Sequence, residues 1–326
     1  MECYTTGDLR YTTGDLSYKL SRIGYGSQFN DLFIENDIIT KKSKTDYGYF
    51  KIHKEILFFK YILNNNITLP IPTIYEFGKD YYKMKYLSDY IPLYKCFTNF
   101  SDDKKHHILQ KITSELNKLH ISTIKSINKE EYNNLILSET YTKIYKRYQE
   151  ITDILKNYTH IKRVNNIEIL SFDKVLDILQ NKVSKYLESQ SLNNSYNISI
   201  IHGDCQFNNI LYNPTNDDFV FIDPRGYFGN IDLYGIPEYD FAKIKFALSG
   251  YDIFDNMEID SLQIIDDNLI LPNINIIDNN KLFERDDIVS ILTISVWLGN
   301  AHCFKNNIPK AIFSLYYALY LASLYL

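Results

Sequence analysis

The second half of the chain reads Ile201-His202-Gly203-Asp204-Cys205-Gln206-Phe207-Asn208-Asn209-Ile210-Leu211-Tyr212 and, shortly after, Phe219-Val220-Phe221-Ile222-Asp223-Pro224-Arg225-Gly226. Within it, Asn209 follows Asp204 by five residues, and Asp223 follows Asn209 by fourteen. Each of these polar residues borders a short apolar run, which predicts strand ends or the loops next to them. The spacing therefore predicts three polar side chains held by neighbouring strands and loops.

These residue types suit phosphoryl transfer. A carboxylate held in a tight loop, as Asp204 would be, orients a substrate hydroxyl and later accepts its proton. Asn209 supplies a neutral amide oxygen and Asp223 a full negative charge, and both are hard ligands that suit magnesium on a polyphosphate. Each residue alone has an ordinary alternative as a turn or capping residue. The three together, with His202 and Gly203 directly before Asp204, predict a phosphoryl-transfer site.

The pattern His-Gly-Asp-x-x-x-x-Asn, followed by an apolar strand and Ile-Asp, resembles the aminoglycoside phosphotransferase and choline kinase family. These are small-molecule kinases with a protein-kinase-like fold. The variant with Asn-Ile-Leu-Tyr and Phe-Ile-Asp-Pro-Arg-Gly resembles a subgroup associated with capsule and sugar biosynthesis. The resemblance implies that Asp204 is the catalytic Asp and that Asn209 and Asp223 bind magnesium. It also implies that His202 braces the catalytic loop and that residues 239–243 match a structural Tyr-Asp-Leu-Ala segment.

The order of predicted elements indicates an α+β fold with two lobes, in which a small sheet-rich lobe precedes a larger helical one. We expect residues 1–87 to form a nucleotide-binding lobe with an antiparallel sheet and one helix. Residues 88–326 would form the catalytic and acceptor-binding lobe. The expected strands are 20–23, 29–34, 38–41, 74–77, 81–86, 198–201, 210–212 and 219–222, and residues 69–72 are extended. The expected helices are 50–63, 102–119, 139–158, 172–190, 238–249, 283–302 and 308–326.

The first lobe offers a cation and an acid in a suitable order. Nucleotide phosphates need a fixed cation, and the resemblance assigns this part to Lys41, at the end of a strand, and its acidic partner to Glu55 on the following helix. Lys42 and Lys44 are alternatives. Because strand side chains alternate between faces, Lys41 shares a face with the apolar Ile39, and we favour it.

Two further segments of this lobe are candidates for nucleotide contacts. The turn with Gly24, Gly26 and Ser27 stands where the family has a phosphate-covering loop, since glycines let backbone amides approach phosphate oxygens. An ordinary hairpin turn is the alternative. Lys85, Tyr86 and Leu87 stand at the expected hinge, where adenine would bond to the backbone. A plain interlobe connection predicts the same sequence.

The acceptor site is less clearly marked. Arg225 either faces a substrate anion or phosphate, or pairs with a structural carboxylate such as Asp240. Asp252, Asp255, Glu258 and Asp260 would attract a cationic acceptor, although a solvated loop is the more common meaning of such a cluster. Trp297 and Phe304 would stack on a sugar or a quaternary ammonium, or else belong to the core.

Composition narrows the remaining possibilities. The chain has 326 residues and a formal net charge of -5, without a basic stripe, so we expect no nucleic-acid partner. Its four cysteines are scattered, and its N-terminus lacks the pattern of a secretion signal, so we expect a cytoplasmic protein with reduced thiols. Residues 311–326 are apolar but shorter than the about 20 residues of a membrane span, which favours a buried helix. The repeat of residues 4–9 at 11–16 and the oligomeric state carry no prediction.

The main hypothesis is a kinase that uses ATP and Mg2+, with GTP as an alternative donor, and phosphorylates a small hydroxylated molecule such as a sugar or amino sugar. The transfer would be direct and in line. One alternative is a kinase of a choline-like alcohol or of a protein. Another is a non-catalytic nucleotide-binding scaffold, which the intact set of Lys41, Glu55, Asp204, Asn209 and Asp223 disfavours.

Overall fold

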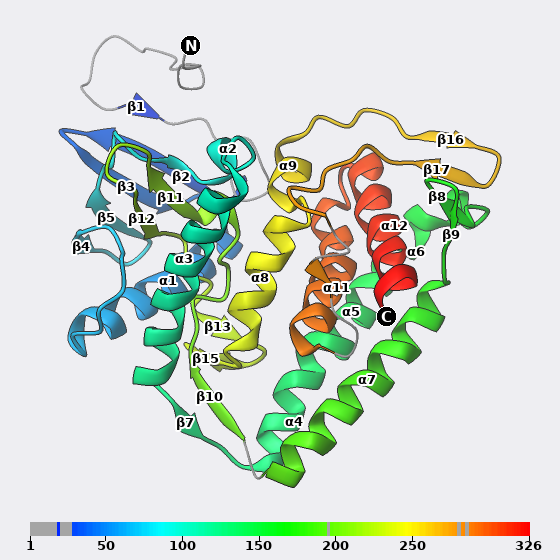
Figure 1. The fold of residues 1–326 in the computed structure, drawn as a ribbon. Coiled ribbons are helices and arrows are strands. Elements are labelled where there is room, and N and C mark those ends of the chain that lie inside the picture. The colour runs from blue at the N-terminus through cyan, green and yellow to red at the C-terminus, as the bar shows by residue number, and fades with distance from the viewer. Residues whose placement is uncertain (1–17, 20–27, 194–195, 279–281, 284–286) are drawn as a thin grey trace. The chain divides into compact units, whose positions relative to one another are not determined.

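A computed structural model describes residues 18–19, 28–193, 196–278, 282–283 and 287–326. The chain forms two compact units (Figure 1). Unit 1 runs to Leu119 and also holds Phe207–Gly226, whereas unit 2 holds His120–Gln206 and Tyr227–Leu326. The predicted division into a nucleotide-binding lobe, residues 1–87, and an acceptor-binding lobe, residues 88–326, is defined by ligand binding. It stays a prediction. Gly24, Gly26, Ser27, the expected strand 20–23 and the repeat at 4–16 lie outside the described residues.

Unit 1 is built on an antiparallel sheet of five strands in the order β1-β2-β3-β5-β4. A two-residue turn joins β2 to β3, and both of its residues, Asn36 and Asp37, have positive φ values of 47° and 62°. Asn and Asp tolerate this left-handed conformation, which suits the twist of a tight hairpin. The predicted antiparallel sheet is confirmed. Its strands are β1 (Tyr18–Lys19), β2 (Asn30–Glu35), β3 (Ile38–Ser43), β4 (Ile74–Phe77) and β5 (Tyr81–Lys85).

Helix α1 (Asp46–Asn64) packs against β3 and β5. It begins one turn before the predicted residue 50, because the Thr45 hydroxyl accepts a hydrogen bond from the Gly48 N–H at 3.0 Å. Such a cap satisfies one of the N–H groups that a helix leaves unpaired. Along its buried face, Phe59 meets the ring of Tyr82 on β5 at 5.4 Å between centroids. The helix and the sheet thus enclose the core of unit 1.

The rest of unit 1 contains the predicted hairpin. Strands β11 (Ile210–Asn213) and β12 (Asp218–Phe221) pair antiparallel, with Ile210 opposite Phe221, and β6 (Ile91–Pro92) joins the free side of β11. The Phe221 N–H donates to the Pro70 carbonyl at 2.7 Å, so the extended segment before β4 anchors the end of the hairpin. The short elements of this part are α2 (Tyr94–Phe97) and η4 (Phe207–Asn209).

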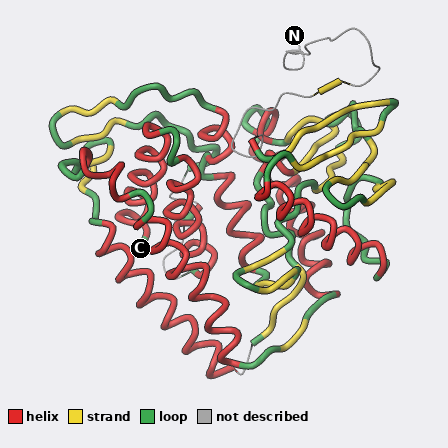
Figure 2. The backbone as a smooth tube through the Cα atoms, turned by 180° about the vertical axis from the view of Figure 1, so that it is seen from behind, coloured by secondary structure: helices red, strands yellow, loops and turns green. Residues whose placement is uncertain are grey.

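Unit 2 is mainly helical, as predicted. Helices α8, α11 and α12 lie side by side in both ribbon views (Figures 1 and 2). Trp297 of α11 is fully buried and packs against Phe246 of α8 and Tyr317 of α12. The helices are α4 (Lys129–Leu137), η2 (Ser138–Thr142), α5 (Lys143–Gln149), α6 (Thr152–Leu155), η3 (Lys156–Tyr158), α7 (Phe172–Asn193), α8 (Glu238–Leu248), α9 (Tyr251–Asn256), α11 (Ile288–Asn300), η5 (Ala301–Phe304) and α12 (Ile308–Tyr325). Helix α3 (Asp102–Ser122) contains the boundary between the units.

The helix predicted over 139–158 has different bounds. Helical structure already begins at Lys129, because the Asn128 side chain accepts a hydrogen bond from the Glu131 N–H at 2.9 Å. A π-helical turn, η2, then separates α4 from α5. In this turn the buried Glu139 accepts a hydrogen bond from the Gly229 N–H at 3.1 Å. Such single π-helical turns within α-helices are frequent at functional sites.

Short sheets complete unit 2. Strand β10 (Asn197–Ile200), which covers most of the predicted strand 198–201, lies between β15 and β7 and leads into the segment with Asp204. A second small sheet has the order β16-β17-β8-β9. The remaining strands are β7 (Lys125–Ser126), β8 (Arg163–Val164), β9 (Ile167–Glu168), β13 (Tyr227–Phe228), β14 (Ile231–Asp232), β15 (Tyr234–Gly235), β16 (Gln263–Ile265) and β17 (Asn268–Ile270).

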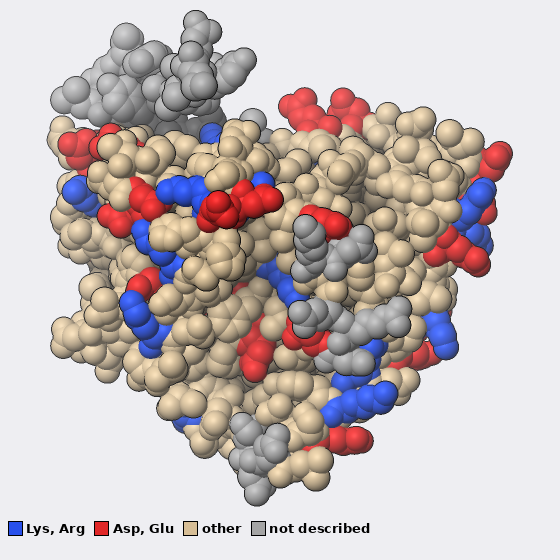
Figure 3. Space-filling view, in the orientation of Figure 1, with Lys and Arg blue, Asp and Glu red and all other residues tan. Residues whose placement is uncertain are grey.

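The apolar C-terminal segment forms α12, and most of its side chains are buried within unit 2. Among the described residues, none of the helices combines the length and the apolarity that crossing a bilayer requires. On the face shown in Figure 3, acidic and basic side chains are interspersed, and neither sign forms a continuous stripe.

Candidate active site

A buried ion pair joins the sheet and helix of unit 1. The Lys41 ammonium, on β3, donates to both carboxylate oxygens of Glu55, on α1, at 2.9 and 2.8 Å. The hydroxyl of Tyr82 donates to the same carboxylate at 2.9 Å. Lys41 is 4% exposed and Glu55 1%. Burial raises the pKa of Glu55 above its ordinary value, although Lys41 opposes this rise. The structure thus brings together the two residues that the sequence singled out.

The neighbouring lysines occupy different environments. The side chain of Lys42 is 52% exposed and lies 3.8 Å from Asp80. That of Lys44 is 40% exposed and lies 3.4 Å from Asp31. Of the three candidates, Lys41 is the one that is buried against a helix carboxylate. Strand alternation, which places Lys41 on the core face with Ile39, accounts for the difference.

Asp223 also contacts Lys41. Its Oδ1 atom lies 3.0 Å from the Lys41 ammonium, and its side chain is 19% exposed. Asp223 has a φ of 56° although Pro224 follows it, and a residue before Pro prefers extended backbone. Three residues on, a side chain at Gly226 would lie 2.3 Å from the Lys54 carbonyl oxygen of α1. A strained Asp and a tightly packed Gly therefore fix this segment against the helix that carries Glu55.

Asn209 lies at the same end of the hairpin as Asp223. The Ile222 N–H donates to the Asn209 carbonyl at 3.0 Å, which places Asp223 one residue beyond Asn209's backbone partner. Asn209 is 7% exposed. An amide oxygen and one carboxylate form a donor set that fits magnesium, which usually takes one or two protein carboxylates and completes its shell with phosphate oxygens and water. No cluster of three or more His, Cys, Asp or Glu side chains that would hold a metal by themselves occurs among the described residues.

The expected hinge is partly engaged within unit 1. The Lys85 N–H donates to the Thr73 carbonyl at 2.8 Å, and the Tyr86 N–H donates to the Asp37 carbonyl at 2.7 Å. A base that binds this segment would therefore use other backbone groups, such as those of Leu87.

In unit 2, Asp240 organises the segment that carries Asp204. Asp240 is fully buried on α8, and its carboxylate accepts hydrogen bonds from the N–H groups of His202 and Gly203 at 3.0 and 2.6 Å. The ring of His120 on α3 bonds to the same carboxylate at 2.9 Å. Burial alone would raise the pKa of Asp240, but these donors hold it below the ordinary value. Asp240 thus fixes the backbone immediately before Asp204.

Asp204 itself is paired with a lysine. The Lys243 ammonium, on α8, lies 2.7 Å from Asp204 Oδ1, and the two side chains are 10% and 28% exposed. The Asp204 N–H donates to Nδ1 of the buried His202 at 3.3 Å, so His202 lies where the predicted bracing contact would act. The sequence analysis missed the Lys243 contact. The available signal was that Asp240 and Lys243, three residues apart, share one face of a helix.

We expect Asp240→Asn to lower the free energy of unfolding by about 3 kcal/mol or more, because an amide cannot accept all the donors that surround this carboxylate. Since its pKa is lowered on folding, Asp240 stabilises the fold above the ordinary Asp pKa, and this contribution is lost as the pH falls. The stability gap between wild type and variant should therefore narrow in acid. Urea unfolding from pH 7 down to pH 3 measures it, and a gap that is constant over this range would contradict the assignment.

Three of the residues considered for the acceptor site, Asp252, Asp255 and Trp297, are buried. Asp252 and Asp255 lie on α9 and are 0% and 5% exposed, so the solvated-loop interpretation is wrong for these two residues. Glu258 and Asp260 are exposed. Trp297 is 0% exposed, which supports the core interpretation over ring stacking on a ligand. Arg225 belongs to unit 1 and is half-buried, and its role stays a prediction.

Comparison with known proteins identifies the fold. The sequence matches no protein-family profile, and a search of curated proteins finds no match. A point mutant of aminoglycoside 2'-phosphotransferase-IIIa, solved as a GDP complex, is 15% identical, with a TM-score of 0.52 over 94% of this chain and 89% of that chain. This chain therefore has the protein-kinase-like fold of that phosphotransferase, which confirms the predicted fold and, at the level of the fold, the predicted resemblance.

Two other solved structures are similar but more distant in shape. The choline kinase from Streptococcus pneumoniae is 12% identical, with a TM-score of 0.49 over 94% of both chains. The ethanolamine kinase from Plasmodium vivax is 15% identical, with a TM-score of 0.45 over 95% of this chain and 81% of that chain.

Proposed function

We propose that this protein is a magnesium-dependent phosphotransferase that moves the γ-phosphoryl group of ATP to a hydroxyl of a small molecule. The observation that carries the proposal is the buried Lys41 ammonium, which contacts both Glu55 and Asp223. These three side chains hold one positive and two negative charges. The excess negative charge at Asp223, beside the Asn209 end of the hairpin, suits a divalent cation.

Unit 1 would bind the nucleotide. In this assignment Lys41 contacts the phosphates, Glu55 keeps the ammonium in place, and Asn209 and Asp223 hold Mg2+. When bound, the ion neutralises charge that develops on the transferring phosphoryl group. The GDP complex of the phosphotransferase with a similar fold supports a nucleotide as the donor. ATP remains our choice of donor, and GTP is the alternative to be tested.

Unit 2 would supply the group that handles the acceptor. Asp204 accepts a hydrogen bond from the acceptor hydroxyl, and the hydroxyl proton passes to this carboxylate and then to solvent. The acceptor oxygen forms a bond to the γ-phosphorus, while the bond from that phosphorus to the bridging oxygen of the leaving diphosphate breaks. Asp204 is assigned this part because its residue type and its spacing of five residues from Asn209 suit phosphoryl transfer.

A small hydroxylated molecule, such as a sugar or amino sugar, is the proposed acceptor. A choline-like alcohol and a protein are the other acceptor classes. A non-catalytic scaffold has no need for a buried lysine between two acids, or for a lysine held on Asp204. The cytoplasmic location and the absence of a nucleic-acid partner remain predictions.

The test is a transfer assay with MgATP or MgGTP and a panel of D-glucose, D-glucosamine, kanamycin, choline, adenosine and a peptide mixture. We expect at least one small acceptor to raise nucleotide consumption about tenfold or more above the rate in its absence, with a phosphate monoester product visible by phosphorus NMR. Chelation by EDTA should stop transfer, and added Mg2+ should restore it. If no magnesium nucleotide shifts the melting temperature and no acceptor is phosphorylated, the proposal fails.

A further inference from the structure

The ion pair between Lys243 and Asp204 has an unusual setting. The Lys243 ammonium lies 2.7 Å from Asp204 Oδ1 and 4.7 Å from the centre of the Phe246 ring. The Tyr251 ring is 6.0 Å away on the other side of the α8–α9 turn. With only 10% of its side chain exposed, this lysine has given up most of its hydration. Such a cation is costly to bury unless a carboxylate and aromatic faces replace the lost water.

Two residues of α8 act on different parts of the Asp204 segment. Asp240 binds the backbone N–H groups of His202 and Gly203. Lys243 instead contacts the Asp204 carboxylate itself. Because the backbone already has its own anchor, the contact with Lys243 is not required to hold the loop. It acts instead on the carboxylate, at the Oδ1 atom.

We propose that Lys243 is a positioning residue for phosphoryl transfer, which holds Asp204 by Oδ1 so that the carboxylate meets the acceptor hydroxyl in a fixed orientation. This inference rests on the proposed function. In a loose phosphoryl-transfer transition state the base acts chiefly by orienting the nucleophile, so a carboxylate that rotates freely would lose most of its effect. A lysine on the carboxylate costs little in this setting, because strong basicity is not required.

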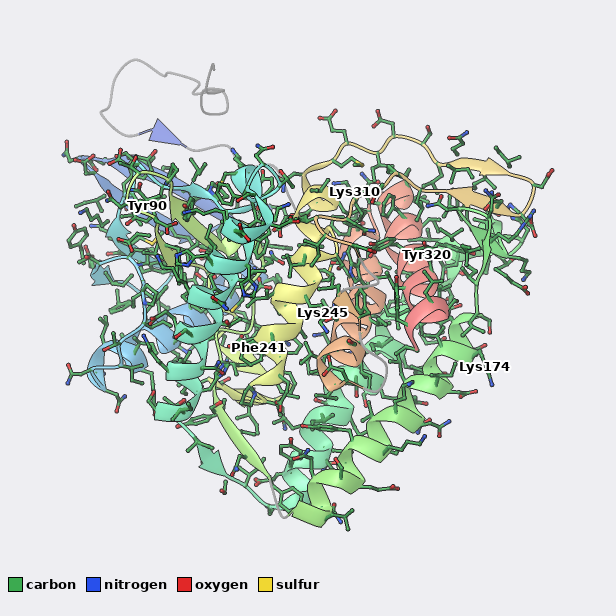
Figure 4. The ribbon with its side chains drawn as sticks, in the orientation of Figure 1. Tyr90, Lys174, Phe241, Lys245, Lys310 and Tyr320 are labelled. Atoms are coloured by element: carbon green, nitrogen blue, oxygen red, sulfur yellow. The ribbon has the colours of Figure 1, made fainter. Side chains whose placement is uncertain are left out.

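A second lysine on the same helix provides a matched control. Lys245, labelled in Figure 4, lies 3.0 Å from Asp287 Oδ2 at the start of α11 and donates to the Ser290 hydroxyl at 3.0 Å. Its side chain is 15% exposed and lies 5.8 Å from the Phe283 ring. It therefore repeats the burial, the carboxylate and the aromatic neighbour of Lys243, but not the contact with Asp204.

The test compares Lys243→Met with Lys245→Met. Phosphate transfer from MgATP to water and to each member of the acceptor panel gives kcat and KM, and calorimetry with MgADP gives nucleotide affinity. We expect Lys243→Met to lower kcat about 100-fold, a loss typical of a misplaced reacting group. The KM for MgATP and the Kd for MgADP should change less than about threefold, because the nucleotide contacts lie in unit 1. Lys245→Met should keep kcat within about threefold of wild type, because Lys245 holds Asp287 and Ser290 instead of the Asp204 carboxylate.

Chemical rescue separates positioning from packing. Lys243→Ala lacks the part of the side chain that n-propylammonium replaces, so this amine should restore at least tenfold in kcat, whereas n-propanol of equal size should not. Equal rescue by both compounds, or equal losses in the Lys243 and Lys245 variants, would reduce Lys243 to a packing role. If Lys243→Met transferred phosphate as fast as the wild type, this inference would be overturned and the proposed function would stand. An absence of transfer by the wild type to water and to every acceptor would overturn the proposed function and this inference with it.

Discussion

Replacement of Asp204 by Asn is expected to lower kcat at least about 1,000-fold while the Kd for MgADP stays within about threefold of wild type. The amide keeps the size of the side chain but cannot take up the hydroxyl proton. It also lacks the negative charge that attracts the Lys243 ammonium, which lies 2.7 Å from the carboxylate. The residues that we propose to contact the nucleotide belong to unit 1 and are untouched by the change. Steady-state transfer from MgATP and calorimetry with MgADP measure the two quantities on the same preparation.

Asp153→Asn is the matched control for this change. Asp153 also belongs to unit 2 and also pairs with a lysine, Lys156, at 2.6 Å, but its side chain is 88% exposed. Both partners are solvated, so this pair contributes little, and the substitution should leave kcat and stability close to wild type. If Asp204→Asn retained more than a tenth of wild-type kcat, the assignment of Asp204 as the residue that orients the hydroxyl would be wrong.

Much of the fold follows from local signals in the sequence. Paired apolar runs around short turns predicted β2 with β3 and β4 with β5, and helical spacing predicted α1, α7 and α12 within a few residues. Strand alternation favoured Lys41 over Lys42, because neighbouring residues of a strand point to opposite faces of the sheet. In the structure Lys41 is buried and Lys42 is exposed. These predictions depend on contacts between near neighbours in the chain, which a single sequence records directly.

Other parts of the site depend on contacts that no local pattern records. Asp240 lies 38 residues from His202 in sequence and 120 from His120, yet its carboxylate joins both. The pairing of Lys243 with Asp204 is equally remote in sequence. The burial of Asp252 and Asp255 likewise comes from the packing of α9 within unit 2, whereas their spacing alone is typical of a solvated loop. Residues that organise a loop from a distant helix need the tertiary structure to be found.

Replacement of Lys41 by Met is expected to lower kcat/KM for MgATP at least about 100-fold and to reduce the free energy of unfolding by about 3 kcal/mol. Met has a similar length but leaves Glu55, which is 1% exposed, without its ammonium. Because Lys41 lowers the pKa of Glu55, its removal should raise that pKa further above the ordinary value. The folded variant then holds a proton that the unfolded chain releases, so its stability should fall as the pH rises from 5 to 8. Steady-state kinetics and urea unfolding across this range test both effects.

Lys42→Met is the control, since it removes the same charge one residue along β3. Lys42 lies 3.8 Å from Asp80 with 52% of its side chain exposed, and such a pair contributes about 1 kcal/mol or less. Its variant should therefore keep wild-type kinetics and show no new dependence of stability on pH.

Glu55→Gln in the Lys41→Met background provides the decisive comparison. If the uncompensated carboxylate is the cause, the second substitution should abolish the pH dependence and recover stability. It should not recover kcat/KM, because the proposed contact of Lys41 with the phosphates remains absent. Recovery of activity in this double variant would show that Lys41 acts only through the fold and does not contact the nucleotide.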